Sequence, residues 1–160
     1  MNHEFILMMH AMLGLLVLLS GIWVFVEALN ANQSNLARIR TGSIFVAAAM
    51  WLTFIVAGYW YVLYYATDKA LILKGPWPFA HDFFMEMKEH VILIVLLLAT
   101  FLPIAARNDL VANRGARTLF LTVAALVVII AFAAEGSGGV ISMGAKVAAS
   151  LNSKLAACPN

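Results

Sequence analysis

The chain contains a single cysteine, Cys158, so it cannot form an internal disulfide. It has no C-x-x-C-H motif, which excludes covalent attachment of c-type haem. Only 11% of its residues are charged, whereas a soluble domain has about 25%. The net charge of +2 is too small to indicate a nucleic-acid partner. No nucleophile triad, phosphate loop or nucleotide-binding fingerprint is present. The composition is that of a membrane protein.

Long apolar runs dominate the sequence, and 64% of its residues are hydrophobic. Each run approaches or exceeds the roughly 17–25 residues that a helix needs to cross a bilayer. The first run lacks a basic n-region and is too long for a signal peptide, so we expect it to remain as an anchor. Short polar connections favour antiparallel neighbours. The sequence predicts an all-α integral membrane protein, with residues 1–135 forming an up-down bundle of four transmembrane helices. We expect the spans at about residues 5–29, 41–65, 88–106 and 117–134.

The arginines indicate the orientation of this bundle. All five lie in the loops after the first and third spans, at Arg38, Arg40, Arg107, Arg114 and Arg117. The positive-inside rule makes that side cytoplasmic and places both termini on the outer, periplasmic side. We therefore expect the inner membrane of a bacterium. Glu27 lies near this arginine-rich end, so the sequence predicts a structural ion pair with an arginine there.

The segment 135–139 (EGSGG) reads as a flexible break after the fourth span. Residues 136–160 would then form an outer C-terminal tail, which could lie on the membrane surface or dock on a partner. The tyrosines and tryptophans near the end of the second span, with Trp60 and Tyr65 among them, are typical of an aromatic belt at the membrane interface.

The segment from His81 to His90 carries six ionisable residues at the mouth of the third span. Such groups are costly near a membrane and therefore mark a candidate functional site. Helical phase places Glu86, Glu89 and His90 on one face. That face continues as a stripe through Leu93, Leu97, Thr100 and Ile104, which we expect to face the bundle. His81, Asp82 and Lys88 are expected to form a solvated helix start.

A second histidine, His10, lies at a similar depth on the first helix, with Gly14 one turn further on. The first and third helices of an up-down bundle are diagonal across its core. His10 and His90 are therefore candidate axial ligands for haem b near the outer face, with Glu86 or Glu89 orienting an imidazole. Gly14 would either leave room for the macrocycle or permit close helix packing.

A non-haem metal is the competing chemistry. His10, His90, Glu86, Glu89 and Glu135 offer nitrogen and oxygen ligands suited to zinc or iron, and neighbouring methionines raise copper as an alternative. Only one E-x-x-x-H unit is present, whereas a ferritin-like di-iron site needs a Glu-x-x-His motif on each of two helices.

These patterns lead to one principal functional hypothesis. The chain is expected to be an electron-transfer subunit that exchanges electrons with quinone or with another membrane or periplasmic subunit. It is a redox subunit of a complex rather than a stand-alone enzyme, and its architecture loosely resembles small four-helix membrane cytochromes of the b type. The alternatives are a non-enzymatic scaffold subunit and a protein with a non-haem metal site.

Overall fold

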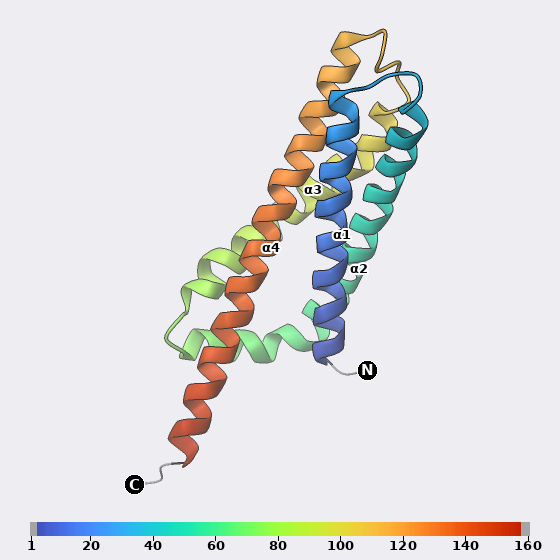
Figure 1. Cartoon of the computed structure of the whole chain (residues 1–160). Helices are drawn as coiled ribbons and strands as arrows, with labels where there is room; N and C mark the ends of the chain where they lie inside the picture. The colour runs from blue at the N-terminus through green and yellow to red at the C-terminus, as the bar shows by residue number, and fades with distance from the viewer. Residues whose placement is uncertain (1–2, 158–160) are drawn as a thin grey trace.

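The computed structural model describes residues 3–157 and contains four long helices and one π-helical segment in that range. All four helices are long and apolar enough to cross a membrane, and η1 continues directly into α3. Both chain ends lie at the same end of the bundle, hereafter the terminal end (Figure 1). The predicted all-α four-helix bundle is confirmed. The elements are α1 (His3–Leu29), α2 (Leu36–Lys74), η1 (Ala80–Met85), α3 (Glu86–Ala105) and α4 (Arg114–Ala157).

The helices pack in the order that short connections predict. α1 lies against α2 and α4, and α3 lies against the same two helices. Within the described residues the backbones of α1 and α3 do not approach each other, so the two helices are diagonal as expected. The main core fills the half of the bundle near the arginines, with Val24, Ile39, Leu102 and Phe120 fully buried. The other half is organised differently.

At the terminal end, α2 changes direction and its last turns run across the base of the bundle towards α4 (Figure 1). Gly75, which follows α2, lies so close to α4 that a Cβ added there would be 2.7 Å from the Cβ of Ala148. A second core forms where these elements meet and includes Ile6, Trp60, Tyr65 and Ile72. Trp60 and Tyr65 are therefore buried packing residues, and their assignment to an aromatic belt is wrong.

α4 is a single helix of 44 residues that passes through segment 135–139 without interruption. The predicted flexible break is wrong, because residues 135–139 continue the helix. Gly138 and, beyond the segment, Gly144 pack closely on neighbours, whereas Gly136 and Gly139 meet none within 4 Å. A Cβ added at Gly138 would lie 3.0 Å from the Lys88 ammonium, and one at Gly144 would lie 2.8 Å from the Ala80 side chain. The predicted outer tail is thus a helical extension of α4 as far as residue 157, while Cys158 falls outside the described residues.

The orientation of α3 also differs from the sequence prediction. Leu93, Leu97 and Ile104, expected to face the bundle, are 55%, 71% and 55% exposed. The buried stripe instead contains Val95, Ala99, Leu102 and Ala105. In a bilayer large apolar residues face lipid as readily as protein, whereas small residues let helices approach. The smaller side chains therefore turn inward, and His90 is exposed on the lipid-facing side with Leu93.

The arginine-rich end is held by side chains that bind helix carbonyl groups. Arg117 donates hydrogen bonds to the last carbonyls of α1, at Ala28 and Leu29, and Arg40 donates to Ala106 at 3.1 Å. Arg38 pairs with Glu27 at 3.2 Å, which confirms the predicted structural ion pair. The arginines therefore stabilise helix ends as well as marking one side of the membrane.

Removal of the Arg117 side chain should destabilise the bundle more than removal of the Arg38 side chain. Arg117→Ala leaves two carbonyl groups of α1 without their cationic donor, at a cost of about 1.5–3 kcal/mol. Arg38→Ala removes only an exposed ion pair, which contributes little to stability. Thermal unfolding in detergent should rank the two variants in that order, and equal losses would contradict this assignment.

Candidate functional site

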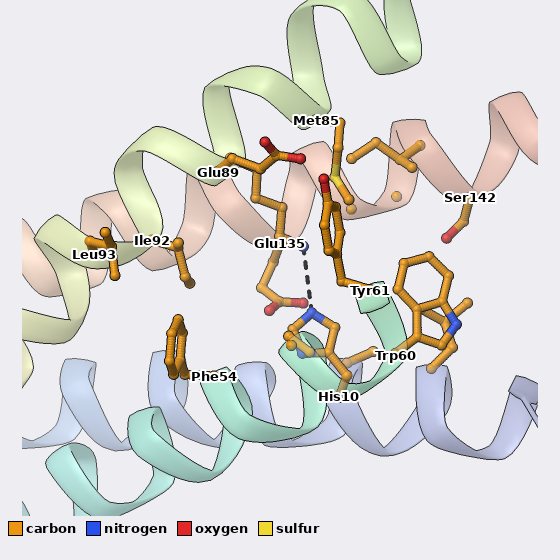
Figure 2. A pocket seen from close by; sticks show the side chains of 18 residues that line it. His10, Phe54, Trp60, Tyr61, Met85, Glu89, Ile92, Leu93, Glu135 and Ser142 are labelled. Carbon is orange, nitrogen blue, oxygen red and sulfur yellow. Dashed lines mark hydrogen bonds between the residues drawn. The ribbon is translucent and has the colours of Figure 1, made fainter. Parts of the chain in front are cut away.

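A cleft of about 570 Å³ lies between the four helices in the half of the bundle near the termini. The diagonal separation of α1 and α3 leaves space there, and α2 contributes Phe54, Gly58, Trp60 and Tyr61 to the lining. One end of the cleft is apolar, with Phe54, Ile92 and Leu93, and its other end carries Trp60 and Ser142 (Figure 2). Polar side chains reach it from three helices: His10 from α1, Lys88 and Glu89 from α3, and Glu135 from α4.

Lys88 reaches His10 across the cleft. The two side chains are part-buried, and the Lys88 ammonium lies 3.5 Å from His10 Nε2. Because an ammonium group can only donate, Nε2 is the acceptor in this long contact, and Nδ1 then carries the imidazole hydrogen. This contact bridges two helices whose backbones do not meet. A metal at His10 Nε2 would have to displace Lys88.

Glu135 lies over the backbone of α1 at Gly14. Its carboxylate takes the place that a side chain at residue 14 would fill, since a Cβ added there would overlap Glu135 Oε1. Gly14 and His10 are one helical turn apart, so the carboxylate and the imidazole share one face of α1. Lys88 is the cation whose charge acts on Glu135. Gly14 therefore admits a carboxylate rather than closer helix packing.

Three buried polar atoms at the cleft lack a hydrogen-bond partner. They are His10 Nδ1, Trp60 Nε1 and Glu89 Oε1, and no other buried side-chain nitrogen or oxygen in the described residues is unpaired. The Thr53 carbonyl is near His10 Nδ1 without completing a hydrogen bond. Unpaired buried polar groups are costly and rare. All three belong to residues that line one cleft, so these donor and acceptor groups are not committed to partners in the protein.

The cleft opens sideways between α2 and α3. Gly58, Tyr61 and Leu93 line it and are exposed. A Cβ added at Gly58 would meet no atom within 4 Å, so this glycine leaves the mouth open. The Tyr61 hydroxyl lies beside the Glu89 carboxylate at the edge of the opening (Figure 2). The cleft is therefore accessible between these two helices.

The residues predicted from the sequence divide into two groups. His10, Gly14, Glu89 and Glu135 come together at this cleft. His90 does not line it; its Nδ1 lies 2.6 Å from the carbonyl oxygen of Glu86 in its own helix. Glu86 also lies outside the cleft. The His10 and His90 imidazoles therefore do not face the same cavity, and haem b stays a prediction.

A metal site is not assembled either. No group of three histidine, cysteine, aspartate or glutamate side chains within residues 3–157 is arranged to hold a metal ion. The oxygen and nitrogen groups of the cleft are instead interleaved with a lysine, whose positive charge opposes cation binding. The candidate ligand set named from the sequence thus has no cation-binding geometry in this range.

Two residues of the cleft were misread from the sequence. Lys88 was expected to be solvated and Trp60 to lie at the membrane interface, yet both line the cleft. The position of Lys88 could have been found from helical spacing. It lies three residues after Met85, which is buried, and four before Ile92, which lines the cleft, so the three share one helical face. Trp60 carried none, because its burial depends on the bend of α2.

No protein-family model matches the chain, and no curated protein and no solved structure shows significant similarity to it. The functional argument therefore depends on the geometry of the cleft.

Proposed function

We propose that the protein is a membrane electron-transfer subunit whose cleft binds a quinone near the outer face of the membrane. The observation that carries the proposal is the group of three unpaired buried polar atoms in an apolar cleft that opens to lipid. A quinone dissolves in the bilayer and has a flat ring with two carbonyl oxygens. A volume of about 570 Å³ is within the range of sites for small ligands.

The polar groups suit both oxidation states of such a ring. Trp60 Nε1 and the Lys88 ammonium can donate hydrogen bonds to quinone carbonyl oxygens. The hydroxyl groups of a hydroquinone are donors, for which Glu89 Oε1 is an unpaired acceptor. The apolar end at Phe54, Ile92 and Leu93 suits the first units of an isoprenoid tail. One site can thus bind the ring before and after reduction.

Reduction of a quinone consumes two electrons and two protons. The electrons would come from a partner subunit or a haem, and the protons need titratable groups beside the ring. Glu89, Glu135 and His10 lie at the cleft and can hold or transfer a proton. With the arginine-rich end in the cytoplasm, these groups belong to the outer half of the membrane.

Binding of decylubiquinone to the full-length protein in lipid nanodiscs tests this proposal. Trp60→Phe keeps an aromatic side chain and removes the N–H donor, so it should weaken binding by about 3–10-fold, the value of one hydrogen bond. Trp51→Phe is the matched control, because Trp51 donates to Thr100 at 3.0 Å outside the cleft. A wild-type protein that does not bind the quinone would refute the proposal.

Haem b is the second candidate, and His10 is the observation in its favour, since this buried imidazole faces the cleft. An absorption spectrum after haem-replete expression separates the two. A Soret band that disappears in His10→Ala but persists in His90→Ala would assign haem to the cleft. A colourless protein that binds decylubiquinone would leave quinone as the ligand. A colourless protein that binds neither would favour a scaffold subunit.

A further inference from the structure

A buried tyrosine and a buried histidine lie between the cleft and the protein surface. Tyr65 is 2% exposed and His81 is 4% exposed. The Tyr65 hydroxyl lies 2.9 Å from His81 Nδ1. The sequence suggested a solvated His81, but η1 turns its side chain inward onto α2. Neither residue lines the cleft, so the proposed ligand site does not by itself explain the pair.

The pair is connected at both ends. Towards the surface, His81 Nε2 lies 3.8 Å from Glu86 Oε1, and the Glu86 side chain is 50% exposed. Towards the cleft, the Tyr65 ring stacks on that of Tyr61, with centroids 5.1 Å apart and planes 21° apart. Tyr61 lines the cleft, and its hydroxyl lies beside Glu89. Titratable groups thus follow one another from the cleft to the surface.

We propose that His81 and Tyr65 form a proton path between the cleft and the aqueous phase at the terminal end of the bundle. This inference rests on the proposed quinone site, whose chemistry needs two protons for every two electrons. His81 binds a proton at Nε2 from the side of Glu86 and releases the proton on Nδ1 to the Tyr65 hydroxyl oxygen. The stacked rings of Tyr65 and Tyr61 carry no proton themselves. Tyr65 therefore passes its own hydroxyl proton to water on the cleft side, and the water delivers it to Glu89. Each residue gains one proton and loses one, so none is consumed, and the reverse direction is equally balanced.

The surroundings of the pair leave it few other proton partners. From α2, Tyr61 and Asp68 are the titratable groups near Tyr65, and from α3 they are Glu86 and Glu89. α4 meets η1 through Gly144 packed on Ala80. The Tyr65 hydroxyl and the His81 imidazole can each donate or accept the hydrogen bond between them, so a proton can cross it in either direction. A purely structural hydrogen bond would need only one of these two arrangements.

The rate at which dithionite reduces bound decylubiquinone tests the path, with the full-length protein in nanodiscs and stopped-flow absorbance as the readout. Tyr65→Phe keeps the ring stack and removes the hydroxyl, and His81→Ala removes the imidazole. We expect each to slow reduction by about 100-fold, the usual size of a lost proton donor, with the quinone Kd nearly unchanged. Imidazole in the buffer should restore the rate of His81→Ala. Tyr64→Phe is the matched control, because Tyr64 is the neighbouring tyrosine and packs on His3 instead.

The outcomes separate this inference from the proposed function. A wild-type protein that binds no quinone would remove both. Wild-type binding, together with unchanged reduction rates in Tyr65→Phe and His81→Ala, would refute the path alone. A slow His81→Ala variant with weakened quinone binding and no response to imidazole would assign the pair a structural role and would likewise refute it.

Discussion

Gly58→Leu is expected to lower the affinity for decylubiquinone by about 100-fold, equivalent to about 2.7 kcal/mol. Gly58 lies at the mouth of the cleft between α2 and α3, and a Cβ added there would meet no atom within 4 Å. A leucine side chain therefore fits there without a clash, but it occupies the opening of the cleft. Titration of the nanodisc-bound protein with decylubiquinone measures the effect.

Gly136→Leu is the matched control for this prediction. Gly136 is also exposed on a transmembrane helix with no atom near its added Cβ, but it does not line the cleft. We expect the control to bind quinone like the wild type. Gly139→Leu provides an independent test, because Gly139 lines the cleft from α4 and is equally unobstructed. It should weaken binding even if Gly58→Leu changes the bend of α2.

A Gly58→Leu variant that folds and binds quinone like the wild type would show that the cleft mouth is not the entrance. Thermal unfolding of the three glycine variants checks that they fold. Leucine is a better helix former than glycine by roughly 0.5–1 kcal/mol, so none should lose stability through helix propensity. A loss of binding without a loss of stability would place the effect at the mouth.

The transmembrane helices could be predicted from the sequence because length and hydropathy alone define a span. The orientation of α3 about its own axis could not. Leu97 and Leu102 are equally apolar, yet Leu97 is 71% exposed and Leu102 is fully buried. Inside a bilayer both environments are apolar, so a hydrophobic stripe does not identify the buried face. The small residues of α3, such as Ala99, were the better indicator.

The candidate site was predicted in part for the same reason. His10 and Glu135 were recognised because ionisable groups in a membrane helix are rare, and both lie at the cleft. His90 was assigned to the bundle interior through the stripe that proved to face outward. The Tyr65–His81 contact depends on the bend of α2 and on the π-helical η1, neither of which follows from apolar periodicity. The sequence shows a glycine at position 58, but it does not predict that this glycine borders the opening of a cleft.

Lys88→Met should destabilise the protein by on the order of 1 kcal/mol, because it removes the cation whose charge acts on the partly buried Glu135 carboxylate. Lys88 and Glu135 approach the cleft from α3 and α4, and the charge of each acts on the other. Methionine preserves most of the length and apolar packing of the lysine side chain. The methionine variant therefore loses mainly the charge and its contact with His10.

Neutralising the partner should reverse most of this loss. In Lys88→Met combined with Glu135→Gln, neither charge is left uncompensated, and we expect the double variant to recover most of the wild-type stability. Glu135→Gln alone should be destabilising in its turn, since it leaves the Lys88 ammonium without its carboxylate. Denaturation of the four proteins in one detergent gives the coupling free energy between the two sites. If the losses of unfolding free energy in the two single variants simply add in the double variant, the two charges act independently. The interaction between Lys88 and Glu135 would then not stabilise the cleft.

The same four proteins separate stability from binding. The double variant regains its charge balance but lacks the Lys88 donor proposed for a quinone carbonyl, so it should be stable and still bind decylubiquinone weakly. A charge-assisted hydrogen bond is worth about 1.5–3 kcal/mol, so the expected loss of affinity is roughly 10–150-fold. Full recovery of binding in the double variant would indicate that Lys88 serves only to neutralise Glu135. Glu135 also lines the cleft, so Glu135→Gln alone is the reference: a stable double variant that binds more weakly than Glu135→Gln would assign the loss to the Lys88 contact with the ligand.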